Sequence, residues 1–204
     1  MRIGIIGSGE LGLTLAELWA RAGHQVLLVA DEEASSDDLS ERLSEFLIEI
    51  APVDDAARSA EVIVLTRPFG TADAGPSPLT VVGKIVIDAM NAGSEDGAGR
   101  SSSEATAERF PQARVVKALN TLPPEILRAE GRRSAPKEQR LAIVMSGDDA
   151  RAKTRVSALI EEIGFTPVDA GTLARGGGFQ QPGSDIFGKP MLPAEARMTL
   201  SLSR

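Results

Sequence analysis

The sequence predicts a single-domain α/β protein in which a mostly parallel sheet is covered by helices on both faces. Three observations carry this prediction. Gly7, Gly9 and Gly12 form a G-x-G-x-x-G pattern between a strand-like apolar segment and one with helical spacing. Short apolar segments then alternate with amphipathic ones, as repeated strand–helix–strand units require. The chain has 204 residues, 42% of them hydrophobic, which is enough for one core and favours one domain over two.

The expected elements follow this alternation from the N-terminus. The apolar run Arg2–Ile6 is typical of a buried parallel strand, and the apolar residues of Glu10–Ala22 recur at helical spacing. Gly23 and His24 end that helix and lead into the second strand. The full set comprises strands over Arg2–Ile6, Val26–Val29, Val62–Leu65, Ile85–Ala89, Val115–Leu119, Leu141–Met145 and Phe165–Val168, and helices over Glu10–Ala22, Asp37–Phe46 and Asp149–Ile163.

Three long segments directly follow expected strands, and a fourth is rich in glycine and proline. Since ligands bind at the carboxyl ends of the strands of an open parallel sheet, the three long segments are expected to form site walls. The fourth, Ala174–Pro193, is either a flexible tail or a cover for the site. We therefore expect a dinucleotide-binding domain over 1–173 and a C-terminal segment over 174–204 that closes the site. The three long segments are Arg67–Gly83, Asn91–Ser103 and Thr121–Arg140.

The composition excludes several classes of function. A net charge of −7 disfavours a surface that tracks nucleic-acid phosphates. The absence of cysteine excludes disulfides, thiolate metal sites and a cysteine nucleophile, and no metal site is predicted. No apolar run approaches the ~20 residues of a membrane span, and the N-terminal apolar stretch is too short and glycine-rich for a signal peptide. We expect a cytoplasmic protein whose partners are small molecules.

The glycine pattern has the chemistry of a dinucleotide fingerprint. Gly7 allows a tight turn, Gly9 lets a pyrophosphate approach the backbone, and Gly12 lets the helix pack on the strand. The N-terminus of the helix supplies free N–H groups and a partial positive charge for phosphates. The sequence therefore predicts a doubly wound fold of the Rossmann type that binds NAD(P)H. The expected cofactor contacts in this turn are Gly7, Ser8, Gly9, Glu10, Leu11 and Gly12.

An acidic residue that could bind the cofactor's ribose follows the second strand. Asp31 lies about 20 residues beyond the fingerprint, as the NAD-binding pattern requires, and Glu32 and Glu33 follow it. A 2′-phosphate would meet three carboxylates with no obvious arginine nearby. We therefore expect NADH to bind at least as well as NADPH. Two alternatives remain: a solvated acidic loop, or a phosphate held by Arg67, which also ends a strand.

Groups that could donate a proton to a substrate are scarce. The chain has no tyrosine and no cysteine, and His24, its one histidine, lies at the sheet edge opposite the ligand edge. We interpret His24 as a structural turn residue. Lys117, Asp88 and Arg67 remain possible, although Asp88 and Lys117 lie within strands and could equally face solvent or pair structurally. A hydride transfer that needs little proton chemistry from the protein fits this inventory best.

Several motifs resemble those of one family, the NADPH-dependent deazaflavin oxidoreductases, which exchange hydride between NADP and coenzyme F420. The motifs are, in order along the whole chain, GIIGSGELG, VIDAMN, ARVVKALNTL, SGDDARAK and IEEIGFTPVDAGTLA. Two positions depart from the family: Ala30-Asp31 replaces a small polar residue and an arginine, and Asn91-Ala92 replaces Asn-Pro. A more distant resemblance links the chain to the N-terminal domain of pyrroline-carboxylate reductases and the cytosolic domain of metalloreductases.

The resemblance implies roles for residues near the reacting ring. Thr66, Arg67, Pro68 and Phe69 would lie against the nicotinamide and its ribose. Asn91 and Asn120 would reach the crevice, and the segment Ala174–Phe187 would help to close the second-ligand site. The family implies a homodimer and no certain catalytic residue, with Asn120 and Lys117 as candidates. The implied substrate contacts are Asn120, Leu122, Gly177, Gly178 and Phe179.

Three functions remain open from the sequence. The leading one is an NAD(P)H-dependent oxidoreductase that passes hydride to a flat acceptor such as a deazaflavin (coenzyme F420) or a flavin. The second is reduction of a small imine or ketone, with Lys117 or a bound water as the proton donor. The third is a dinucleotide-binding protein without catalysis, because a fold does not determine a function.

Overall fold

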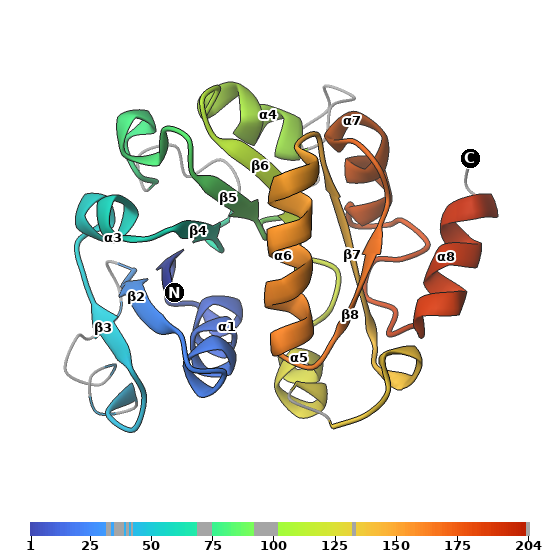
Figure 1. Ribbon diagram of the computed structural model, residues 1–204, viewed down its shortest axis with the longest axis horizontal. Coiled ribbons are helices and arrows are strands. Elements are labelled where there is room, and N and C mark those ends of the chain that lie inside the picture. The colour runs from blue at the N-terminus through green and yellow to red at the C-terminus, as the bar shows by residue number, and fades with distance from the viewer. Residues whose placement is uncertain are drawn as a thin grey trace.

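An eight-stranded sheet in the order β3-β2-β1-β4-β5-β6-β7-β8 runs through the computed structural model (Figure 1). Residues 1–31, 34, 39, 41, 43–68, 75–91, 102–131 and 134–202 are described. Neighbouring strands pair in parallel except β6 and β7, which are antiparallel, so the predicted mostly parallel sheet is confirmed. The strands are β1 (Arg2–Ile6), β2 (Gln25–Val29), β3 (Ile48–Ile50), β4 (Val62–Leu65), β5 (Ile85–Asp88), β6 (Arg114–Ala118), β7 (Ala142–Gly147) and β8 (Thr166–Asp169).

Helices cover both faces of this sheet. One core cluster joins α1, α5 and α6 to one face, and a second joins α3, α4 and η2 to the other. The doubly wound prediction is therefore confirmed. The α-helices are α1 (Glu10–Arg21), α3 (Val53–Ser59), α4 (Ser102–Arg109), α5 (Pro124–Glu130), α6 (Ala150–Glu162), α7 (Leu173–Gly176) and α8 (Pro193–Leu202), and the 3-10 helices are η2 (Pro78–Val81), η3 (Lys137–Gln139) and η4 (Gly177–Gln180).

The central strands and the two longest helices form where the sequence pattern is clearest. Strand β4 is buried along its whole length, which agrees with its continuous apolar run. Helix α1 buries Leu15 and Trp19 on one side, and Trp19 Nε1 donates a hydrogen bond to the Leu159 carbonyl of α6 at 3.1 Å. Helix α6 begins at Asp149, whose side chain accepts from the N–H of Ala152 at 2.7 Å. These contacts hold α1 and α6 together on one face.

Several elements were not expected. Strand β3 and helix α3 are too short to show a period, and α5 begins at the Pro123-Pro124 pair, which reads as a loop. The segment Thr121–Arg140 therefore contains α5 and η3. The helix expected over Asp37–Phe46 lies largely outside the described residues.

The C-terminal segment contains short helices around its glycines and prolines. It begins with α7 and η4 and ends with α8, which packs on β7 and β8 (Figure 1). Ala196 and Leu200 of α8 are buried against Val144 and Val168. This part of the chain therefore contributes to the hydrophobic core.

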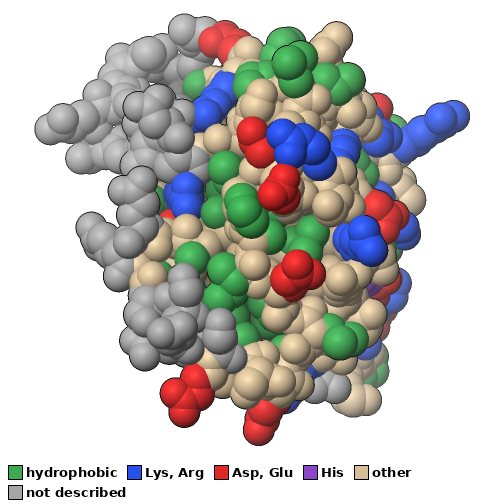
Figure 2. All heavy atoms as spheres, turned by 90° about the vertical axis from the view of Figure 1, so that its left-hand side faces the viewer, with side chains coloured by type: hydrophobic (Ala, Val, Ile, Leu, Met, Phe, Trp, Pro, Cys, Tyr) green, Lys and Arg blue, Asp and Glu red, His purple; other side chains and the backbone are tan. Residues whose placement is uncertain are grey.

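The described part of the chain has a surface of mixed charge. Figure 2 shows the side of the molecule that faces left in Figure 1, where acidic and basic side chains are interspersed. None of the helices in the described ranges has the length and apolar character needed to cross a membrane.

His24 is buried at the amino end of β2, with Nε2 at 2.7 Å from Glu162 Oε2 at the end of α6, as suits a structural residue.

Candidate functional site

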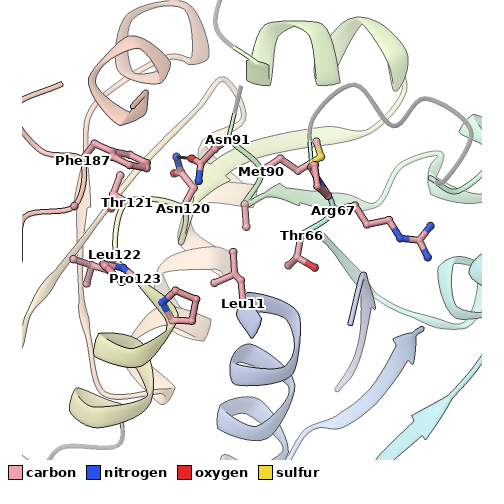
Figure 3. Close-up of a pocket in the computed structure, with 14 residues that line it drawn as sticks. Leu11, Thr66, Arg67, Met90, Asn91, Asn120, Thr121, Leu122, Pro123 and Phe187 are labelled. Carbon is pink, nitrogen blue, oxygen red and sulfur yellow. Dashed lines mark hydrogen bonds between the residues drawn. The ribbon is translucent and has the colours of Figure 1, made fainter. Parts of the chain in front are cut away.

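A cavity of about 450 Å³ opens at the carboxyl ends of the central strands, beside the glycine turn (Figure 3). Its walls come from the start of α1, from the segments after β4, β5 and β6, and from the C-terminal segment. Its described lining is Leu11, Thr66, Arg67, Pro68, Ala89, Met90, Asn91, Asn120, Thr121, Leu122, Pro123, Pro124, Phe187 and Gly188.

The three glycines of the fingerprint have different surroundings. A Cβ at Gly12 would lie 2.0 Å from the Gly7 carbonyl oxygen, so Gly12 is required for packing of α1 against the turn. A Cβ at Gly9 would meet no protein atom within 4 Å. Gly9 is also the N-cap of α1, without a side-chain hydrogen bond to the helix. The free N–H groups and the open space at Gly9 fit a bound pyrophosphate.

Thr66 joins the end of β4 to this turn. Its Oγ1 donates to the carbonyls of Ile6 at 3.0 Å and Gly7 at 3.3 Å, and the residue also lines the cavity. Pro68 follows in the lining, whereas Phe69, the next residue implied by the resemblance, lies outside the described residues. The segment after β4 therefore forms one wall of the cofactor side.

Asp31 has an arginine partner, so the expectation that none lies nearby is wrong. Arg67 Nε lies 2.7 Å from Asp31 Oδ1, and Arg67 Nη2 donates to the Ala30 carbonyl at 2.9 Å. Asp31 Oδ2 also accepts from the Ser8 N–H at 2.8 Å. The pair forms because β2 and β4 both flank β1, which brings together residues 36 positions apart. Glu32 and Glu33 lie outside the described residues. The expected NADH preference stays a prediction, but the charge of Asp31 is balanced.

Asn120 follows a strained residue at the end of β6. Leu119 has a φ of +69°. No other non-glycine among the described residues has a positive φ, and such a conformation costs roughly 1–2 kcal/mol. The Asn120 Nδ2 group donates to Asn91 Oδ1 at 2.9 Å and to the Gln180 carbonyl at 2.7 Å. Its Oδ1 is buried without a hydrogen-bond partner, which costs about 1–3 kcal/mol. Strain and an unpaired acceptor together at a cavity wall are typical of a binding residue.

Lys117 and Asp88 form a fully buried pair outside the described lining of the cavity. Lys117 Nζ lies 3.4 Å from Asp88 Oδ1 and 3.1 Å from Ser102 Oγ, and it also donates to the Met90 carbonyl. Burial lowers the pKa of Lys117, and the Asp88 carboxylate opposes this shift. Asp88 accepts in turn from the Met90 N–H at 3.0 Å and from Thr106. The sequence left open whether Lys117 and Asp88 face solvent or pair structurally, and the structure shows that they pair. Neither residue lines the cavity.

The C-terminal segment reaches the cavity at the end of the predicted range Ala174–Phe187, and not through Gly177, Gly178 or Phe179. Phe187 and Gly188 line it, and the Gly188 N–H donates to the Thr121 carbonyl at 2.8 Å. Phe179 instead packs against the cluster beneath α8, and Gly177 is buried. Gly178 and Gly177 are outside the cavity's described lining, whereas the predicted Leu122 is within it. An aromatic residue followed by glycine in an irregular segment was the signal that could have identified Phe187.

Comparisons with known proteins agree with this geometry. A family model described as "NADP oxidoreductase coenzyme F420-dependent" matches residues 2–92. Hypothetical protein SMa0349 from Sinorhizobium meliloti is 32% identical, with a TM-score of 0.78 over 94% of this chain and 95% of that one. A protein from Arthrobacter sp. fb24, whose description proposes an F420-dependent NADP-reductase, is 26% identical, with a TM-score of 0.76 over 94% of this chain and 99% of that one.

The curated relatives are longer than this chain and match it over part of their length. Metalloreductase STEAP3 from Rattus norvegicus is 28% identical over 178 residues, which are 85% of this chain and 34% of the relative. The chain thus spans about a third of the length of the curated relatives that it matches. The glycine turn, the sheet order and the full-length similarity to the Sinorhizobium protein lead to one assignment. The chain belongs to the family of NADP oxidoreductases described as coenzyme F420-dependent.

Proposed function

We propose that this protein transfers hydride between a nicotinamide dinucleotide and a flat acceptor, such as a deazaflavin or a flavin. The observation that carries the proposal is the chemistry of the cavity wall. Its described lining contains amides, hydroxyls and apolar groups, and Arg67 is its one ionisable residue. Arginine stays protonated in proteins and does not donate a proton to a substrate. A reaction that needs little acid–base help from the protein suits such a site.

Different residues would bind the pyrophosphate and orient the reacting rings, at opposite ends of the cavity. The Gly9 turn and the N-terminus of α1 would bind the pyrophosphate, and the Asp31–Arg67 pair would lie on the ribose side. Bound NAD(P)H supplies the hydride. Asn91 and Asn120 would orient rings at the other end, where apolar side chains exclude water.

The geometry gives no support to Lys117 as the proton donor of an imine or ketone reductase. Its side chain has no exposed surface, and its ammonium group is held by Asp88, Ser102 and the Met90 carbonyl. A donor must come within hydrogen-bond reach of the substrate, directly or through one water. Reduction of a small imine or ketone would therefore depend on a bound water in this cavity.

Anaerobic mixing with NADH or NADPH tests the proposal directly. Flavins, a deazaflavin, a cyclic imine and a small ketone would be offered in turn, and oxidation of the nicotinamide would be followed by absorbance. We expect turnover with the deazaflavin or flavin and little with the imine or ketone. Turnover of the imine or ketone alone would replace the proposal, and binding without any turnover would support a non-catalytic role.

We also propose a homodimer, from the family resemblance, which light scattering after gel filtration would test.

Substitution of Arg67 with alanine is expected to weaken NADPH binding about tenfold more than NADH binding. The change removes a guanidinium from the ribose side and exposes the charge of Asp31, which repels a 2′-phosphate. Calorimetric titrations of both cofactors at matched ionic strength would measure the difference. Arg58→Ala is the control, because Arg58 is exposed on α3 and pairs there with Asp55. Equal losses for the two cofactors would remove Arg67 from phosphate recognition.

Replacement of Phe187 with alanine should raise the KM for the acceptor about tenfold and change the Kd for NADPH less than twofold. The ring lines the end of the cavity near Asn120 and Thr121, away from the glycine turn (Figure 3). Phe179→Ala is the matched comparison, since Phe179 packs beneath α8 and should affect thermal stability instead. A raised KM for Phe179→Ala alone would instead show that Phe179, the residue implied by the resemblance, contacts the acceptor.

A further inference from the structure

The unpaired carbonyl oxygen of Asn120 shows what kind of group this end of the cavity can bind. We propose that Asn120 Oδ1 accepts a hydrogen bond from an amide-type N–H at the edge of a planar ring ligand. This inference rests on the proposed function, because it describes the rings that meet in the cavity. It specifies the ligand further: a flat ring system that carries an N–H donor in its plane.

The orientation of the Asn120 amide is determined by a backbone group. Its Nδ2 lies 2.7 Å from the Gln180 carbonyl oxygen, which can only accept a hydrogen bond. A flipped amide would bring two acceptors together at that distance. The second acceptor, Asn91 Oδ1, lies 2.9 Å from the same Nδ2. Both contacts use the nitrogen, so the buried oxygen is the atom of this amide that lacks a partner.

Asn120 differs from the other buried residues with an unpaired polar atom. Among the described residues, Ser103 Oγ and Gln180 Oε1 are also buried without partners, but neither residue lines the cavity. Asn120 does line it, and its side chain is almost fully buried, with the residue 4% exposed. The positive φ of Leu119 directs the chain into this position at the end of β6. An acceptor held this firmly is suited to a donor in one fixed direction.

The surroundings of Asn120 favour a flat ring over a flexible or charged donor. Phe187, Leu122 and Pro123 line the same end of the cavity and present apolar surfaces (Figure 3). No carboxylate lies in the described lining, so an ammonium donor would have no counter-charge there. A neutral amide-type N–H in the plane of a ring system satisfies both conditions. Two ligands have one: the nicotinamide carboxamide, and the ring imide of a flavin or deazaflavin.

Paired ligands that differ only in this N–H distinguish the two sources. NADPH would be compared with its reduced 3-acetylpyridine analogue, which lacks the carboxamide nitrogen, and riboflavin with 3-methylriboflavin. Dissociation constants from fluorescence titration avoid dependence on turnover. We expect the ligand without the N–H to bind about tenfold more weakly in one of the two pairs. In Asn120→Leu the discrimination should fall to within about twofold.

Asn91→Leu serves as the matched control, because it removes the neighbouring amide and retains Asn120 Oδ1. The discrimination should persist in that variant. If the unaltered protein discriminates in neither pair, or if discrimination persists in a folded Asn120→Leu, the inference is overturned. If Asn120→Leu does not fold, an absence of discrimination in the wild-type titrations still overturns the inference. Binding discrimination without reduction of any flavin or deazaflavin would overturn the proposed function and leave the role of Asn120 intact.

Discussion

Replacement of Gly9 with valine is expected to lower dinucleotide affinity at least about a hundredfold while the protein stays folded. Gly9 has φ −63° and ψ 174°, a conformation that valine adopts readily, and a Cβ there meets no protein atom within 4 Å. The new side chain would therefore project into the space reserved for the pyrophosphate. Calorimetric titration with NADH and NADPH would measure the loss, and thermal unfolding would confirm the fold.

Two further variants show whether the effect belongs to the site. Ala22→Val adds bulk at the exposed C-cap of the same helix and should leave affinity within about twofold. Gly12→Ala should act on stability, by about 3 kcal/mol, because its Cβ would press on the Gly7 carbonyl. Unchanged cofactor affinity in folded Gly9→Val would refute the assignment of the phosphates to this turn.

Substitution of Lys117 with methionine should lower the free energy of unfolding by about 3–5 kcal/mol. The change leaves the fully buried Asp88 carboxylate without its cation. A loss of this size is a large part of the 5–15 kcal/mol that stabilises a typical domain. Urea unfolding would measure it. Lys137→Met is the control, since Lys137 forms an exposed pair with Glu161 and should cost at most about 1 kcal/mol.

The double variant Lys117→Met/Asp88→Asn separates a structural role from a catalytic one. Removing the charge of Asp88 as well should restore more than half of the lost stability, because no unpaired ion remains buried. We expect the folded double variant to reduce its acceptor within about tenfold of the wild-type rate. A loss of several orders of magnitude in that folded variant would instead identify Lys117 as a proton donor.

The first strand–helix–strand unit could be predicted almost to the residue. Strand β1 and helix α1 have strong periodic patterns, and the glycines mark the turn between them. Helix α3 was missed because its seven residues show too little period, and it is stabilised by burying Ala56 and Ala57 on the sheet. The direction of β7 could not be read either, since an antiparallel strand has no distinct local pattern.

By itself, the sequence determined the dinucleotide turn and the scarcity of proton donors, because both depend on residue type and short spacing. Only the tertiary structure decided how the charged and polar residues pair. Strand order brings Arg67 to Asp31, adjacent strands bury Lys117 against Asp88, and the fold at Leu119 leaves Asn120 Oδ1 unpaired in the cavity. The first two of these contacts join residues far apart in the chain. Local periodicity predicts whether a position is buried, but not which distant group it contacts there. That partner determines whether a buried polar side chain is structural or available to bind a ligand.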